Sequence, residues 1–302
     1  MISCPREIPV AALEFPMLGY IFIEPFHPAS IIRVKKRMLP FSRGREVVRK
    51  GSKERIHHMQ AYKEVSEEFL SKQRLLVVSP HADDESFGCA GTMAKVKKLG
   101  GEVYVLVMSV GDLKLYDGKK DVVKGTTREE EFAAVAKFLK LDGYDIWYKD
   151  PETHLRLDKI PQRDLINVIE KESKVSLDNI NPTMVALPAI SYNQDHVATF
   201  KAGFTACRPH DPKVKAFPRV VVSYDNQTLF WNVDYDKFHP NLYVDISDFL
   251  DVKLKALSLH KSQLRHSPHH CSIENMEYLA RTRGHEISVK AAEAYVCHRM
   301  VL

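Results

Sequence analysis

The sequence contains few cysteines and no long apolar run, and these shortages exclude several classes of protein. Its five cysteines are scattered over 302 residues without a CxxC pair, so we expect no disulfide framework and infer a reducing, cytoplasmic setting. The apolar stretch 8–23 is interrupted by Glu14 and Pro16 and has no basic leader. It is therefore too short and too broken for a transmembrane segment or a signal peptide. Basic residues follow at 33–37, which leaves a peripheral role at a membrane surface open.

Charge of one sign is not concentrated either. The chain has 44 Lys and Arg against 39 Asp and Glu, a formal net charge of +5. This mild excess lacks the dense basic stripe of a nucleic-acid-binding protein, so we expect no nucleic-acid partner. Hydrophobic residues make up 44% and aromatic residues 9% of the chain, which argues against a fibrous or disordered protein. The length fits one large α/β domain or two small ones.

The first 70 residues differ in pattern from the rest. Lys and Arg are frequent in residues 33–55, where few positions are apolar. Apolar residues then recur every three or four positions from Ile56 to Phe69, which predicts a helix over residues 52–70. We interpret residues 1–70 as an N-terminal extension of unassigned role and residues 71–302 as one α/β domain.

Buried strands alternate with helices from residue 75 onward. Apolar runs predict strands over 75–79, 103–109, 144–148 and 183–187, with further short strands over 220–223 and 242–244. Helices are predicted over 92–99, 127–139, 164–172, 195–207 and 248–260, the first ending at Gly100 and the second starting with a capping box of Thr127 and Glu130. This alternation predicts a mainly parallel sheet with helices on both faces, in which sites form at the carboxyl ends of the strands.

The first predicted strand runs directly into a group of ionisable residues. His81, Asp83, Asp84 and Glu85 follow one another there, and such a concentration at a sheet edge is costly unless it binds something. The spacing of His81 and Asp84 allows both to face one ion, and this donor set suits Zn²⁺ or a similar divalent metal. Asp83 between them is then a candidate general base. The alternative is that the three acids only cap the following helix.

These residues resemble the PIG-L/LmbE-like family of N-acetylglucosaminyl de-N-acetylases. The family opens with His-Pro-Asp-Asp-Glu and a Gly-rich turn, and this chain has Ala82 in place of the proline. Further matches are Ser109-Val110-Gly111-Asp112, Arg128-Glu129-Glu130-Glu131, Asn193-Gln194-Asp195-His196, a late segment with Lys253, His260 and Gln263, and Glu293-Ala294-Tyr295. The resemblance covers residues 74–297 and implies a Rossmann-like fold with one zinc ion.

The resemblance also implies roles for individual residues. His196 matches the third metal ligand beside His81 and Asp84, and Asp195 matches the acid that precedes it. Arg128 and Asp150 correspond to residues that contact the sugar. His260 could approach the site, although a histidine on an amphipathic helix is more often a packing residue. Asn193 replaces a histidine that helps to stabilise the oxyanion, and an amide cannot carry positive charge or give up a proton.

The predicted activity is removal of an N-acetyl group from an amino sugar by hydrolysis of its linear amide bond. The metal would hold a water and polarise the carbonyl, while Asp83 would take the water's proton and pass it to the amine. One alternative is a metal- and sugar-binding protein with weak catalysis, because Asn193 replaces the family histidine. A nucleotide-cofactor enzyme is disfavoured, since the first turn has no GxGxxG and its acidic doublet would repel a pyrophosphate. The expected partner is a small amino-sugar conjugate, and relatives often form homo-oligomers.

Overall fold

The computed structural model describes residues 60–114, 122–226, 231 and 238–302, and the basic region 33–55 lies outside them. The described residues form one compact unit. Residues 60–71 are helical, so the helix predicted over 52–70 is confirmed where it is described. Leu70 at the end of this helix is buried in the main core. No helix within the described residues is long and apolar enough to cross a membrane.

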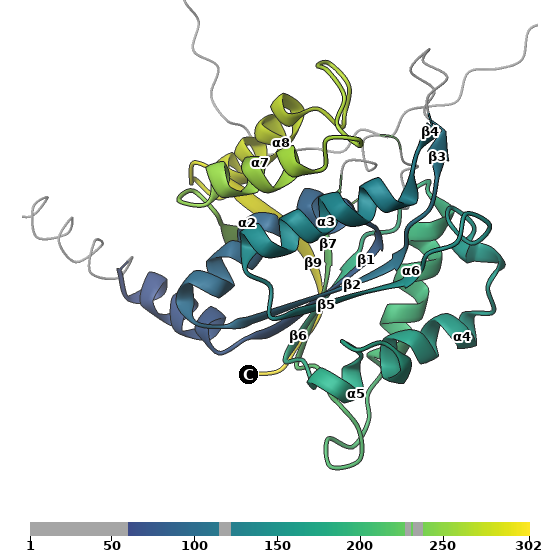
Figure 1. Cartoon of the computed structure of the whole chain (residues 1–302). Helices are drawn as coiled ribbons and strands as arrows, with labels where there is room; N and C mark the ends of the chain where they lie inside the picture. Colours follow the sequence, from purple (N-terminus) through teal and green to yellow (C-terminus); the bar gives the residue numbers. More distant parts are fainter. Residues whose placement is uncertain (1–59, 115–121, 227–230, 232–237) are drawn as a thin grey trace, which may run out of the picture. The chain divides into compact units, whose positions relative to one another are not determined.

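The described part of the chain builds a mainly parallel sheet, as predicted (Figure 1). Five neighbouring strands pair in parallel: β1 (Arg74–His81), β2 (Glu102–Ser109), β5 (Gly143–Tyr148), β6 (Met184–Pro188) and β7 (Val220–Tyr224). Strand β9 (Ala292–Met300) runs antiparallel to both of its neighbours, β7 and β8 (Leu242–Asp245). Their order across the sheet is β5-β2-β1-β6-β7-β9-β8. A separate small ribbon pairs β3 (Leu113–Lys114) with β4 (Val122–Val123).

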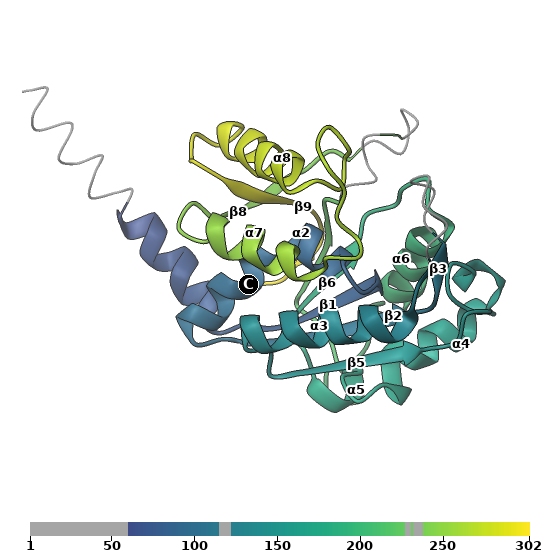
Figure 2. The ribbon, with the colours of Figure 1, turned by 45° about the horizontal axis from the view of Figure 1, so that its top comes forward.

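Helices cover both faces of the sheet (Figures 1 and 2). One face carries α2 (Asp84–Leu99), α3 (Gly125–Leu139), α7 (Leu250–Leu259) and α8 (Ile273–His285), and the other carries α4 (Gln162–Asn167), α5 (Leu177–Ile180) and α6 (Gln194–Ala206). Strand β1 supplies both cores, because Leu75 and Val77 point into the first and Leu76 and Val78 into the second. The α/β, Rossmann-like class with two covered faces is therefore confirmed.

Helix α2 is longer than its pattern predicts. It begins at Asp84, eight positions before the predicted start at residue 92, although Gly88 and Gly91 lie in its first turns. Both glycines permit close packing, since a Cβ on Gly88 would lie 2.2 Å from the Tyr224 ring and one on Gly91 would lie 2.8 Å from Ile246. The predicted stop is confirmed: Gly100 has a φ of 99° and its N–H bonds to the last turn.

Two predictions about the helices were wrong. The capping box of Thr127 and Glu130 does not form, because α3 starts at Gly125, after Lys124. The Gly125 N–H instead donates to the carboxylate of Asp112, a residue from the preceding loop, at 2.9 Å. The helix predicted over 164–172 is α4 followed by a π-helical turn, Val168–Glu172. Helix α8 and strand β9 were not predicted.

The packing of α2 against β7 can be tested at Gly88. We expect Gly88→Ala to lower the free energy of unfolding by roughly 1–3 kcal/mol, because the added methyl overlaps the buried Tyr224 ring. Urea unfolding monitored by circular dichroism measures the change. Lys98→Ala on the exposed side of the same helix is the control and should stay within about 0.5 kcal/mol of wild type. Equal stability of both variants would contradict this packing.

Candidate functional site

The candidate site lies where the order of the strands reverses. The chain builds the sheet outward from β1 through β2 to β5, and then returns to place β6 on the other side of β1. Loops leaving β1 and β6 at their carboxyl ends therefore separate, and ligands bind at such points in open α/β sheets. His81 is the last residue of β1, and His196 lies in the first turn of α6, directly after the loop that follows β6.

Asp84 lies between these two histidines. Its Oδ2 is 3.2 Å from Nδ1 of His81 and 3.3 Å from Nε2 of His196. One ligand atom from each of the three residues lies within 4.8 Å of the others, and all three side chains are buried. The other ring nitrogen of His196, Nδ1, has no hydrogen-bond partner among the described residues. Two imidazoles and a carboxylate are the donor set of a zinc site with an open position, so the residues present fit such an ion.

Asp195 orients His81 from the side opposite Asp84. Its Oδ2 lies 2.9 Å from Nε2 of His81, and its Oδ1 accepts the backbone N–H of Leu157 at 2.9 Å. A carboxylate paired to the outer nitrogen of an imidazole fixes the ring and leaves the inner nitrogen for a ligand. Burial lowers the pKa of His81, but the hydrogen bonds to Asp195 and Asp84 outweigh it and raise the pKa to about 9.

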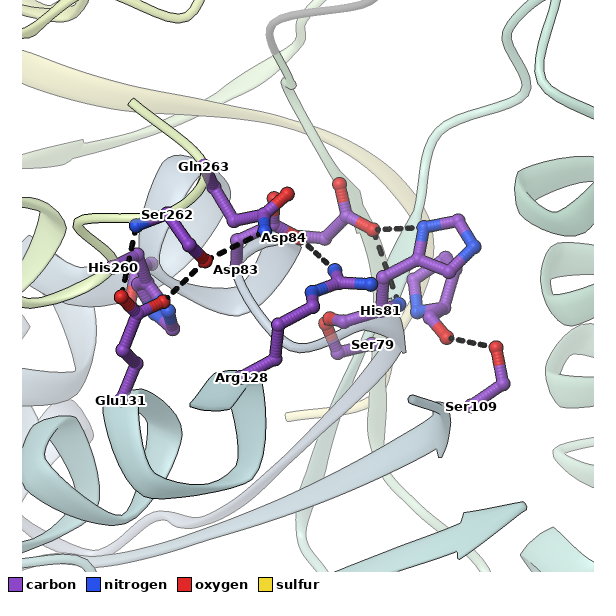
Figure 3. Close-up of polar contacts among 12 residues, drawn as sticks. Ser79, His81, Asp83, Asp84, Ser109, Arg128, Glu131, His260, Ser262 and Gln263 are labelled. Atoms are coloured by element: carbon purple, nitrogen blue, oxygen red, sulfur yellow. Dashed lines mark hydrogen bonds and ion pairs between the residues drawn. The ribbon is translucent and has the colours of Figure 1, made fainter. Parts of the chain in front are cut away.

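Asp83 and Asp84 are neighbours with opposite pKa shifts. Burial raises the pKa of Asp83, and the charge of Asp84 adds to the increase, while Arg128 opposes it with Nη2 at 3.8 Å from Oδ1 (Figure 3). Burial would also raise the pKa of Asp84, yet His196 and His81 lower it well below its ordinary value. Asp84 therefore stays ionised, while Asp83 takes up a proton more readily. An ionised carboxylate suits a metal ligand, and a carboxylate with a raised pKa suits a group that takes and gives protons.

Arg128 points into the site and is held there by a histidine that sequence reasoning missed. Arg128 is 2% exposed, and its Nη1 donates to Nε2 of His154 at 2.7 Å. Nδ1 of His154 then carries the proton and lies 3.2 Å from Oγ of Ser109, at the end of β2. Glu131, the neighbour of Arg128 one turn along α3, instead accepts bonds from the N–H and Oγ of Ser262.

His154 is neutral because of its surroundings. Burial lowers its pKa, and the positive charges of His81 and Arg128 lower it further, to about 2. The residue lies in the turn after β5, and its ring meets that of His81 edge to face at a centroid distance of 5.2 Å. A single histidine in a loop carries no spacing signal, so only its place in the fold identifies it.

Three further residues that the sequence predicts for the site make contacts outside the group of His81, Asp84 and His196. Asn193 caps α6, with its Oδ1 accepting the N–H of Asp195 at 2.9 Å. Asp150 is exposed and accepts the N–H of Thr153 at 2.7 Å, so it orders the turn that carries His154 and lies outside the buried group. His260 is fully buried, with Nε2 at 3.0 Å from Oε1 of Glu85. A contact of Asp150 or His260 with substrate remains a prediction.

Lys253 and Glu293, two of the residues that match the family near the end of the chain, contact the backbone of α2. Nζ of Lys253 is 2.6 Å from the carboxylate of Glu293 and donates to the carbonyl of Phe87 at 2.6 Å. The carboxylate of Glu293 also accepts the N–H groups of Gly91 and Thr92. This buried ion pair therefore satisfies backbone groups of the helix on which Asp84 lies.

The chain is similar to known deacetylases. The PIG-L family model, GlcNAc-PI de-N-acetylase, matches residues 76–207, which include His81, Asp84 and His196. This match confirms the resemblance to the PIG-L family. A diacetylchitobiose deacetylase of Thermococcus kodakarensis is 26% identical over 208 residues, covering 66% of this chain and 73% of its own.

Two further comparisons cover a similar part of the chain. A probable N-acetyl-alpha-D-glucosaminyl L-malate deacetylase of Bacillus anthracis is 24% identical over 195 residues, covering 64% of this chain and 82% of its own. The crystal structure of a conserved protein from Thermus thermophilus superposes with a TM-score of 0.57 at 24% identity, covering 76% of this chain and 96% of that one. The structural likeness establishes the fold.

The buried, neutral state of His154 predicts how stability depends on pH. The pKa of His154 in the folded protein is about 2, below the ordinary value of 6.5. Between these two pH values the histidine binds a proton in the unfolded chain but not in the folded one. The stability that this provides is present above pH 6.5 and is lost as the pH falls, by at most about 1.4 kcal/mol per pH unit. His154→Gln keeps an acceptor for Arg128 but cannot titrate, so it should lose less stability on acidification.

Urea unfolding at about pH 7 and about pH 5.5, with a chelator present, measures this dependence. We expect wild type to lose about 1 kcal/mol more than His154→Gln between the two pH values. His285→Gln, an exposed histidine on α8, is the matched control and should behave like wild type. Parallel losses in wild type and His154→Gln would contradict the burial of a neutral imidazole.

Proposed function

We propose that the protein is a zinc-dependent hydrolase that removes an acetyl group from the nitrogen of an amino-sugar conjugate. The observation that carries the proposal is the buried group of His81, Asp84 and His196 with Asp83 beside it. The names of the two relatives in the sequence comparison support the reaction class, because both are deacetylases and one acts on diacetylchitobiose. Substrates of this kind are small molecules with many hydroxyl groups.

The metal would be held by Nδ1 of His81, the carboxylate of Asp84 and a ring nitrogen of His196. When bound, it would supply Lewis-acid polarisation of the amide carbonyl and lower the pKa of the attacking water. Zinc suits this mixed nitrogen and oxygen set, and other divalent metals of similar softness fit it as well. Asp195 would keep the His81 ring in the tautomer that leaves Nδ1 free, as its 2.9 Å contact with Nε2 favours.

Asp83 is the residue we assign to proton transfer. Its carboxylate would take a proton from water as the water oxygen bonds to the amide carbon, and would return that proton to nitrogen as the C–N bond breaks. The products are the free amine and acetic acid, which ionises to acetate by releasing the second water proton to solvent. Burial and the charge of Asp84 raise the pKa of Asp83, which makes it a stronger base than an ordinary carboxylate.

Arg128 is the residue we assign to substrate binding. Its guanidinium is buried, lies 3.8 Å from Asp83 and has an Nε without a partner among the described residues. Planar donors of this kind bind paired oxygens such as neighbouring sugar hydroxyls. His154 would keep the fork in place through the 2.7 Å bond to Nη1.

A sugar-binding protein with weak catalysis is the second candidate, and Asn193 favours it. The Oδ1 of this residue is engaged as the cap of α6, and an amide has no proton to give to a leaving amine. In the deacetylase that we propose, Asp83 alone performs both proton transfers.

A cytoplasmic location and the extent of the N-terminal extension, residues 1–70, are further parts of the proposal that rest on sequence alone.

The test is release of free amine from a panel of N-acetylglucosamine conjugates with zinc added. We expect turnover by wild type and a loss of at least about 100-fold in Asp83→Asn with metal content unchanged, since this is the scale of a general base. His81→Ala and His196→Ala should lose the metal. Asp251→Asn, an exposed acid on α7, is the control and should keep full activity.

The same assay separates the two candidates. Wild-type turnover that survives Asp83→Asn would contradict the assigned base. An inactive wild type that gains activity only through Asn193→His would support the binding protein, because the new imidazolium restores a charged donor.

A further inference from the structure

The loop between α7 and α8 carries a second group of metal-ligating side chains. His269, His270 and Cys271 follow one another there, and one ligand atom from each lies within 4.8 Å of the others. In a tetrahedral zinc site the ligand atoms are about 3.5 Å apart, as bond lengths of about 2.0 Å to nitrogen and 2.3 Å to sulfur require. The three side chains therefore need to move by only about 1 Å to share an ion.

Hydrogen bonds and ring contacts direct the two imidazoles. Nδ1 of His269 accepts the backbone N–H of Cys271 at 3.0 Å, which leaves Nε2 as the ring nitrogen for a metal. The rings of His269 and His270 stack at a centroid distance of 4.2 Å and an interplanar angle of 25°. Burial lowers the pKa of both imidazoles, which favours the neutral form that metals bind.

The loop is tied to the protein at both ends. It begins with His260, whose Nε2 lies 3.0 Å from Oε1 of Glu85. Two positions later, the hydroxyl of Ser262 donates to the carboxylate of Glu131, which lies on α3 (Figure 3). It ends at Ser272, whose hydroxyl caps α8. Cys271 packs against the small apolar cluster that includes Phe87 of α2. The ligands are thus held on a fixed turn and not on a free tail.

The group lies at the edge of the site described above. Phe87, which belongs to the cluster against which Cys271 packs, follows Asp84 by three positions on α2, so this part of the loop lies against the first turn of that helix. A cation bound by the loop would be attracted by the carboxylates of Asp83 and Asp84.

We propose that His269, His270 and Cys271 form a second zinc site at the rim of the candidate active site, separate from the one at His81. Binding would form bonds from the ion to two ring nitrogens and to sulfur, and the thiol proton would be released to solvent. Three protein ligands leave one position open to water or to a group of the substrate. An imidazole–thiolate set prefers Zn²⁺ over the hard cations Mg²⁺ and Ca²⁺.

Cobalt is the probe that distinguishes the two sites, because only the loop site contains sulfur. Purified full-length protein, stripped with a chelator under reducing conditions, is titrated with Co²⁺ and followed by near-ultraviolet absorption. We expect a thiolate-to-cobalt charge-transfer band and a second equivalent of bound metal, with the band abolished by added Zn²⁺. Cys271→Ser should lose the band, and His270→Ala should lose it while retaining the thiol.

Matched controls keep the result specific. Cys297→Ser removes another partly buried cysteine, and His266→Ala removes a histidine of the same loop, so both should keep the band. His81→Ala should also keep it, which makes the outcome independent of the proposed function. A single equivalent of cobalt without a thiolate band in wild type, or a band that survives Cys271→Ser, would overturn the proposal.

Discussion

The carboxylate of Asp84 joins two segments of the chain that are more than a hundred positions apart. It lies 3.2 Å from the imidazole of His81 and 3.3 Å from that of His196, and all three groups are removed from water. A buried carboxylate without partners would be strongly destabilising, so this contact requires both histidines to be in place. The reversal of strand order between β1 and β6 brings them together, and a bound divalent cation would take over the role that the two imidazoles share.

The groups around this contact form a connected set in which each charge has a partner. Asp195 bonds to the far side of His81, and Arg128 bonds to His154 and faces Asp83. Such an arrangement is stable only as a whole, because removing one member leaves another charge buried and unpaired. It also orients donors and acceptors before a substrate arrives, which is the condition for strong electrostatic catalysis in a dry site.

The sequence predicts most of this architecture where a local pattern exists. Buried apolar runs locate β1, β2, β5, β6 and β7 to within a residue or two, and the proposed ligand positions His81 and Asp84 follow from their place after the first strand. Helix α8 is not predicted from the sequence because only Met276, Ala280 and Gly284 are buried on it, and this apolar stripe is too weak to indicate a helix. Strand β9 is not predicted because Glu293 interrupts its apolar run. This carboxylate can be buried because the fold brings Lys253, a residue forty positions earlier, to pair with it.

Contacts between distant residues explain the remaining differences. The cap of α3 comes from Asp112, thirteen positions before Gly125, so no capping motif at the helix itself could predict it. His154 acquires its role from Arg128 and Ser109, which lie on other elements. The family resemblance predicts site roles for Arg128 and His196 but gives none to His154, which holds the guanidinium, because a lone histidine in a loop has no spacing to match.

Anomalous diffraction at the zinc absorption edge, on crystals of zinc-loaded protein, can show whether a metal binds between His81, Asp84 and His196. We expect a peak within bonding distance of Nδ1 of His81, the carboxylate of Asp84 and a ring nitrogen of His196, with Asp83 beside it and not among the ligands. The opposite result is a protein that releases amine but shows no peak at this position, with Asp84 still in direct contact with both imidazoles. That result would contradict the proposed metal site.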